Sequence, residues 1–171
     1  MERNEQVLRF LQEQGIAYRL FEHEPKWTID DCLSTPGLDA GRTTVPRNAF
    51  LCNRQQTAFF LMLLSPLQPF RTAVVSKLLG VSRLSFAPEE ALSRLLGVSA
   101  GAVSPLGLLF DGEKQVRLAM DGTLLAHESL WFHPCVNTQS VEIATKDFIG
   151  RFLPALGREC AFLDLTKEGE T

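Results

Sequence analysis

The segment that most restricts the fold is an apolar run over residues 57–64 (TAFFLMLL). A strand with one solvent-facing side alternates apolar and polar residues, whereas this run is apolar at nearly every position, so both of its faces must be covered. Residues 49–53 form a second apolar strand, and the NRQQ between the two predicts a hairpin. The hairpin is therefore expected at the centre of a sheet.

Further helices and strands are predicted on both sides of this hairpin. The 3.6-residue periodicity, start signals and glycine stops predict helices over residues 4–14, from Thr28 onward, and over 72–79, 88–96 and 145–156. Strands are predicted over residues 18–22, 115–120, 140–144 and 160–165, and a loop over 34–46. The order of elements is mixed, which favours an α+β (mixed α/β) fold around one sheet.

Length and charge limit the classes of protein that are compatible with the sequence. The 171 residues fit one domain, for which we expect residues 1–166, followed by a disordered tail over 167–171. A net charge of -3 argues against a broad cationic face for nucleic acid, although a small local RNA contact remains open. The N-terminus has no secretory signal, and no apolar run is long enough to span a membrane, so we expect a cytoplasmic protein without membrane contact.

The reactive side chains match no standard motif for metal, redox or nucleotide chemistry. The cysteines, which we expect to be free thiols, form no CxxC pair, and the histidines include no two pairs at the spacing of a zinc site; these residues are Cys32, Cys52, Cys135, Cys160, His23, His127 and His133. GxSxG, GxxxxGK[ST] and GxGxxG do not occur. We therefore expect neither a metal nor a cofactor, and polar residues in turns remain as candidates for a pocket.

The stretch LWFHPCVN, residues 130–137, is the most distinctive of these turns. His133 is a candidate to bind a substrate, but a histidine beside aromatic residues is also often a hydrogen-bonded core group. Cys135 is expected to be a buried small hydrophobic residue, and Asn137 either contacts a substrate or caps the backbone.

Several motifs, taken together in their order, make the sequence resemble the prolyl-tRNA editing family, which includes YbaK-type proteins and the insertion domain of bacterial prolyl-tRNA synthetase. The motifs are HEP (23–25), RNAFL (47–51), SKLLGVSRLSFA (76–87), LLGVSAGAVSPLGL (95–108), FHPCVN (132–137) and DFIGRFLPALG (147–157). The resemblance spans roughly residues 3–165 and is nearest to the branch that removes alanine from the tRNA for proline. It implies a partly barrel-like mixed sheet flanked by helices, and metal-free, substrate-assisted hydrolysis.

The resemblance also implies roles for individual residues. The expected catalytic residues are Arg47, Asn48, Gly101, Ala102, Val103, Ser104, Pro105 and His133, and main-chain amides of the GAVSP loop are expected to face the reacting ester. The expected substrate-binding residues are His23, Lys77, Arg83, Phe86 and Asn137, with Phe86 expected either in the core or in a pocket wall. The family commonly has lysine before the asparagine of this strand, and Arg47 departs from that pattern with a planar, forked cation.

The implied partner is the acceptor end of a mischarged tRNA, with prolyl-tRNA synthetase or an elongation factor as further partners, and the protein is expected to be a monomer or weak dimer. Two alternatives to alanine release stay open. One is a deacylase for another small amino acid, cysteine or serine. The other is a binding module that has lost catalysis, which the change at Arg47 would signal.

Overall fold

The apolar hairpin forms the middle of a five-stranded sheet in this computed structural model, which describes residues 1–166. β3 (Arg47–Cys52) and β4 (Phe59–Leu64) pair antiparallel, and all six residues of β4 are buried. β4 is followed in the sheet by β6 (Val116–Asp121) and β9 (Cys160–Leu163), both parallel to it, while β5 (Ser85–Phe86) lies on the other edge. The predicted hairpin and its two covered faces are confirmed.

A second sheet of four strands accompanies the first, in the order β1-β8-β7-β2. Its strands are β1 (Tyr18–Glu22), β8 (Gln139–Ala144), β7 (Ser129–Phe132) and β2 (Thr43–Thr44). β7 and β2 were not predicted as strands. Both are short, and β2 is strand only because Thr43 and Thr44 pair with β7, so the loop predicted for residues 34–46 is wrong at these two positions.

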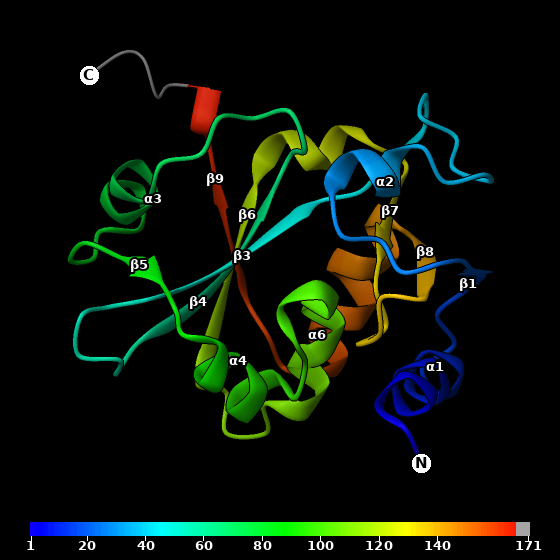
Figure 1. The fold of residues 1–171 in the computed structure, drawn as a ribbon, viewed down its shortest axis with the longest axis horizontal. Helices are drawn as coiled ribbons and strands as arrows, with labels where there is room; N and C mark the ends of the chain where they lie inside the picture. The colour runs from blue at the N-terminus through cyan, green and yellow to red at the C-terminus, as the bar shows by residue number, and fades with distance from the viewer. Residues whose placement is uncertain (167–171) are drawn as a thin grey trace.

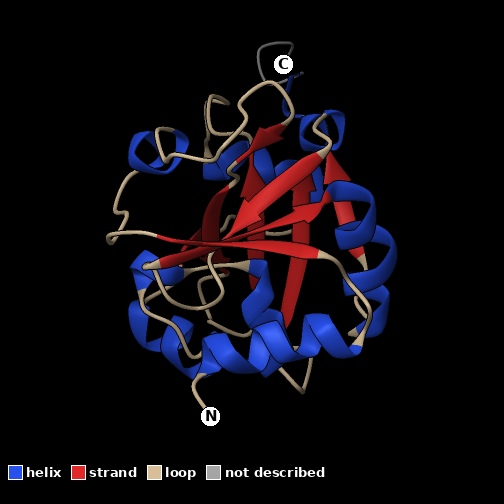
Figure 2. Cartoon of the chain, turned by 90° about the vertical axis from the view of Figure 1, so that its right-hand side faces the viewer, coloured by secondary structure: helices blue, strands red, loops and turns tan. Residues whose placement is uncertain are grey.

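The helices surround the two sheets, as Figure 2 shows with the strands in the middle and the helices outside. They are α1 (Arg3–Glu13), α2 (Ile29–Leu33), α3 (Thr72–Leu79) and α4 (Glu89–Leu96), with 3₁₀ turns η1 (Ala100–Ala102), η2 (Pro105–Phe110) and η3 (Gly122–Ala126). The last predicted helix is one helical segment made of α5 (Thr145–Asp147), the π-helical η4 (Phe148–Phe152) and α6 (Leu153–Ala155). Among the described residues, none of these helices could cross a membrane.

Three groups of buried side chains hold these layers together. The largest lies between the sheets and joins Leu61 and Leu63 of β4 to Leu130 of β7 and Ile143 of β8. The opposite face of β4, including Met62, packs in a second group with α3. The third covers the outer face of the second sheet, where α2 lies over Trp131.

The mixed α/β fold class is confirmed, but the single sheet expected is wrong, because the strands are divided between two sheets. Figure 1 shows α2 close to β7, in the region where the polar motifs of the sequence meet. The disordered tail expected for residues 167–171 lies outside the described residues.

Candidate functional site

A cavity of about 280 Å³ opens beside α2 on the outer face of the second sheet. Segments far apart in the sequence form its walls: the start of β3, the η1 turn, the end of β7 and the residues around α2. Of the residues expected to be catalytic, this cavity brings together Arg47, Asn48, Gly101, Val103 and His133.

His133 follows β7 directly, and the two nitrogens of its ring have different partners. Nδ1 lies 2.9 Å from the main-chain oxygen of Gln139, and since a carbonyl can only accept, Nδ1 carries the proton in the neutral ring. Nε2 is then an acceptor, with Sγ of Cys32 4.0 Å away. Burial lowers the pKa of His133 below its usual value, which the Gln139 contact opposes and nearby His23 reinforces. The ring is therefore a neutral acceptor near pH 7.

His23 supports the cavity rather than lining it. Its Nδ1 donates to the main-chain oxygen of Glu24, and its Nε2 accepts from the hydroxyl of Ser140, each at 2.7 Å. Ser140 lines the cavity, and the rings of His23 and His133 lie 6.1 Å apart. Through this hydrogen bond His23 fixes the direction of the Ser140 hydroxyl.

Arg47 and Asn48 bring incompletely paired polar atoms to the cavity wall. The Nη2 group of Arg47 donates to the main-chain oxygen of Gln68, while the buried Nε has no partner among the described residues. The buried Oδ1 of Asn48 also lacks a partner in this part of the chain, and its Nδ2 makes only a long contact of 3.4 Å to Pro46. Unpaired buried polar atoms are costly, so these two side chains are incompletely satisfied by the described residues around them.

Hydrogen bonds and the burial of two residues fix the GAVSP loop in place. The Ala102 amide donates to the main-chain oxygen of Ser99 at 3.0 Å, so it is already used within the turn. Ser104 is fully buried and its hydroxyl accepts from the Leu106 amide, while Pro105 begins η2 and is buried as well. Ser104 and Pro105 therefore support the loop, whereas Gly101 and Val103 face the cavity.

The expectation for Cys135 is confirmed. Its side chain is buried in the core between the sheets, and its backbone adopts a positive φ of 65° at the turn after His133. Burial raises the pKa of its thiol to about 12, so the group stays protonated.

None of the five residues expected to bind substrate is among those that line this cavity, and three of the five lie in other parts of the molecule. Arg83 and Phe86 border a separate groove beside β5, and Lys77 is exposed on α3. The core position expected for Phe86 is wrong, because β5 is an edge strand of two exposed residues and Phe86 is 64% exposed. Asn137 lies near Gly101, and its main-chain oxygen accepts from the Lys26 amide.

Several residues that line the cavity were not predicted as site residues, namely Lys26, Trp27, Cys32, Trp131 and Ser140. Trp131 is fully buried, stacks on Phe21 with ring centroids 4.4 Å apart, and donates from Nε1 to Oε1 of Glu142 at 3.0 Å. A signal existed in the two-residue spacing of Trp131 and His133, which places both on the same face of a strand.

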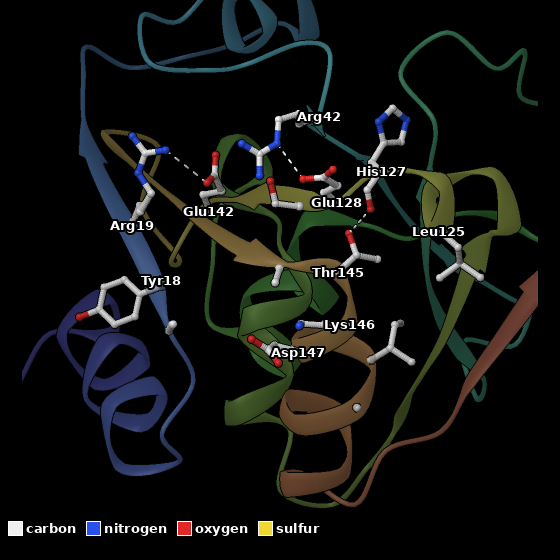
Figure 3. A pocket seen from close by; sticks show the side chains of 15 residues that line it. Tyr18, Arg19, Arg42, Leu125, His127, Glu128, Glu142, Thr145, Lys146 and Asp147 are labelled. Atoms are coloured by element: carbon white, nitrogen blue, oxygen red, sulfur yellow. Dashed lines mark hydrogen bonds and ion pairs between the residues drawn. The ribbon is translucent and has the colours of Figure 1, made fainter.

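A larger basin of about 950 Å³ lies toward the other end of the same sheet. Figure 3 shows its charged residues pairing with one another: Arg19 with Glu142, and Arg42 with Glu128 at 2.7 Å. It contains none of the residues expected to be functional. Across the described residues, no cluster of three metal-ligating side chains occurs here or elsewhere.

The fold and the smaller cavity define a mixed α/β domain with a compact pocket whose walls include an imidazole and a glycine-containing loop. The chain belongs to the aminoacyl-tRNA editing domain family, whose model matches residues 23–150.

Individual proteins agree with this assignment. The prolyl-tRNA editing protein ProX of Acetoanaerobium sticklandii is 28% identical over 149 residues, which cover 86% of this chain and 88% of ProX. The prolyl-tRNA synthetase associated domain-containing protein 1 of Bos taurus is 26% identical, with 90% of each chain covered. A solved structure of a proposed trans-editing enzyme for prolyl-tRNA synthetase has a TM-score of 0.72 at 18% identity and covers 96% of this chain and 98% of its own, which supports the fold.

Proposed function

We propose that the protein is a trans-editing deacylase of the cytoplasm, built as one domain over residues 1–166, that hydrolyses the ester between alanine and the tRNA for proline. The observation that carries the proposal is the convergence of His133, Arg47 and the Gly101 loop on one small cavity. Its volume of about 280 Å³ lies just below the range of most ligand pockets, about 300–1,000 Å³, which suits a small aminoacyl group.

Each wall has a task in this reaction. Nε2 of His133 accepts a hydrogen bond from the α-ammonium or ribose hydroxyl of the substrate. Arg47 and Asn48 line the same cavity and contact the terminal ribose and phosphate. Because the Ala102 amide is used within the η1 turn, the Val103 amide is the better candidate to stabilise the oxyanion, a contribution of about 3–4 kcal/mol for one donor.

The chemical step is an ordinary ester hydrolysis. A water molecule, positioned with help from the ribose hydroxyl, attacks the carbonyl carbon of the aminoacyl ester. The tetrahedral intermediate collapses with cleavage of the bond to the ribose oxygen, which leaves as a hydroxyl, and alanine leaves as its carboxylate. The protein contributes position and preorganised dipoles, and no covalent intermediate is required.

Selectivity in this proposal is a size filter. Trp131 provides a large buried wall, and the Cys32 side chain also lines the cavity. One methylene changes binding in an apolar pocket by only about 1–3 kcal/mol, so exclusion of larger side chains is the effective device. Alanine, serine and cysteine differ little in size and should be separated only partly.

The test is a deacylation assay on the tRNA for proline, charged in turn with alanine, serine, cysteine and proline. The proposal expects release of alanine at the highest kcat/KM and little release of proline. Faster release of cysteine or serine would reassign the substrate within the same chemistry. Tight binding of alanyl-tRNA without release would favour the binding-module alternative, to which the departure at Arg47 points.

A further inference from the structure

The cavity is too small to enclose an entire aminoacyl-adenosine. At about 280 Å³ it lies below the range that surrounds most drug-sized ligands, about 300–1,000 Å³. An alanyl ester and its ribose fill such a space. The terminal base must then lie at the rim, where the chain has to offer a surface for it.

Trp27 is the rim residue best suited to that task. It borders the cavity, yet it is 72% exposed, whereas most aromatic side chains of the chain are buried or half-buried. Among the described residues, no aromatic ring or cation covers its indole. An exposed tryptophan face at the mouth of a polar pocket is apolar surface without a protein partner.

Packing on Gly101 and hydrogen bonds of the neighbouring residues also restrain the Trp27 indole. Its edge packs on Gly101 so closely that a Cβ at that position would lie 2.6 Å from Cζ3 of Trp27. On one side of it in the chain, the Lys26 amide donates to the main-chain oxygen of Asn137 at 3.3 Å. On the other, the hydroxyl of Thr28 caps α2 by accepting from the Asp31 amide at 3.1 Å. The ring is therefore a fixed shelf rather than a freely moving side chain.

The charges around this shelf suit a nucleotide end. Lys26 borders the cavity immediately beside Trp27, and Arg47 lies on the opposite segment of the wall. The protein as a whole carries a charge of -3, so a contact with RNA has to be local and has to combine stacking with a few cations. Trp27 and Lys26 offer that combination within two residues of chain.

We propose that Trp27 is a stacking platform for the unpaired terminal base of the tRNA acceptor end, with Lys26 beside the adjoining phosphate. The proposal rests on the proposed function for the identity of the substrate. It adds a base-binding site outside the reacting cavity, and it gives Gly101 the role of seating the indole.

The test asks whether the Trp27 ring and the terminal base of the RNA contribute to the same contact. Wild type, Trp27→Ala and Trp27→Phe are compared on alanyl-tRNA and on the same tRNA with a terminal nucleotide that lacks its base. Loss of one base–aromatic stack predicts a rise in KM of about 10-fold or more for Trp27→Ala at nearly constant kcat. Trp27→Phe should restore most of the affinity, since a phenyl ring still stacks. On the substrate without a base, all three proteins should have similar KM values.

Leu125→Ala is the matched control, since Leu125 is also an exposed apolar side chain but borders the larger basin. The platform is refuted if Trp27→Ala keeps the wild-type KM. It is also refuted if removing the ring and removing the base raise KM by independent factors that multiply, because partners in one stack should give the same rise whether one or both are removed. Loss of affinity for prolyl-tRNA synthetase with unchanged KM for tRNA would identify a protein contact and would likewise refute it.

A binding titration separates this proposal from the proposed function. Trp27 and Trp131 are the only tryptophans, and both border the cavity, so a non-hydrolysable 3′-alanylamino-adenosine can quench either indole. The part of the fluorescence change that is lost in Trp27→Phe therefore reports on Trp27. If the wild type binds the analogue but releases no alanine, the deacylase function fails while the platform stands. An analogue Kd that is the same for wild type and Trp27→Ala overturns the platform, whatever the activity.

Discussion

Sγ of Cys32 and Nε2 of His133 lie 4.0 Å apart inside the cavity, and both groups are neutral near pH 7. Burial raises the pKa of the Cys32 thiol and lowers the pKa of the His133 imidazole, so proton transfer from the thiol to the imidazole is unfavourable. A thiolate–imidazolium pair, which a cysteine nucleophile requires, is therefore disfavoured. The imidazole therefore stays neutral, and its Nε2 can accept a hydrogen bond from the substrate.

The pH dependence of activity should follow His133. The groups near its ring are Cys32, His23 and the cations of Arg47 and Lys26 at the cavity wall, and burial is the main reason for its lowered pKa. We expect kcat/KM to stay constant from about pH 8 to 6.5 and to fall only at lower pH, below the usual histidine pKa of about 6.5. A fall centred at or above pH 6.5 would contradict this assignment.

The same shift affects stability. An unfolded chain, in which the histidine has its usual pKa, binds the proton first as the pH drops. The contribution of His133 to the free energy of unfolding is therefore complete above about pH 6.5 and is lost as the pH falls toward the lower folded-state pKa. Urea unfolding at several pH values, compared with His133→Gln, measures this contribution.

Gly101→Ala should weaken substrate binding. The new Cβ would lie 2.6 Å from the Trp27 ring and 3.3 Å from the Asn137 amide, so the indole has to move out of its packed position on residue 101. Loss of about 1 kcal/mol of binding corresponds to a rise in KM of about fivefold. Gly112→Ala is the control, because a Cβ there meets nothing within 4 Å. Equal KM values for the two variants would show that the contact with Trp27 has no role.

Arg47→Lys should preserve or raise kcat/KM if the position holds a ribose or phosphate through its charge. The guanidinium now donates to the main-chain oxygen of Gln68 and leaves Nε buried without a partner in the described chain, whereas an ammonium is compact and free to turn. Arg47→Met, which removes the charge, should lower kcat/KM by about 10-fold or more. A lysine variant as poor as the methionine variant would show that the forked geometry is required.

Stability should depend strongly on Arg158. Its Nη1 lies 3.1 Å from Oδ2 of Asp111 in a buried ion pair and also donates to the main-chain oxygen of Val116. Its Nη2 donates to the main-chain oxygen of Leu108. Arg158→Met leaves the Asp111 carboxylate buried without its cation, which should lower the free energy of unfolding by about 3–5 kcal/mol. Arg9→Met, which breaks the exposed pair with Glu13, should cost less than about 1 kcal/mol. Chemical denaturation of both variants gives the comparison.

Strong local patterns made much of the fold predictable. The apolar run of β4 indicated a strand with two covered faces, and the glycines after α3 and α4 end those helices in the left-handed region, with φ of 69° at Gly80 and 68° at Gly97. β7 escaped prediction because it has only four residues and is followed at once by a turn. Without β7, the common face of Trp131 and His133 could not be recognised.

The candidate site was predictable only as far as the family motifs reach. Motif order located Arg47, Gly101 and His133, but it carries no information on which motifs meet in space. Arg83 and Phe86 stand in a motif as well matched as the others and still border a different groove. Trp27 was missed because Thr28 and the aspartates after it were interpreted only as a helix start, and exposure at a cavity rim is a tertiary property.

The central claim is that the cavity around His133 hydrolyses the alanyl ester, and single-turnover release of alanine from alanyl-tRNA for proline tests it most directly. Wild type should release alanine, and His133→Gln should be slower by about 10-fold to 100-fold, the loss of one hydrogen bond to a charged group. His127→Gln, which changes a half-buried histidine at the larger basin, should match wild type. No release by wild type, or equal release by His133→Gln and His127→Gln, would contradict the account.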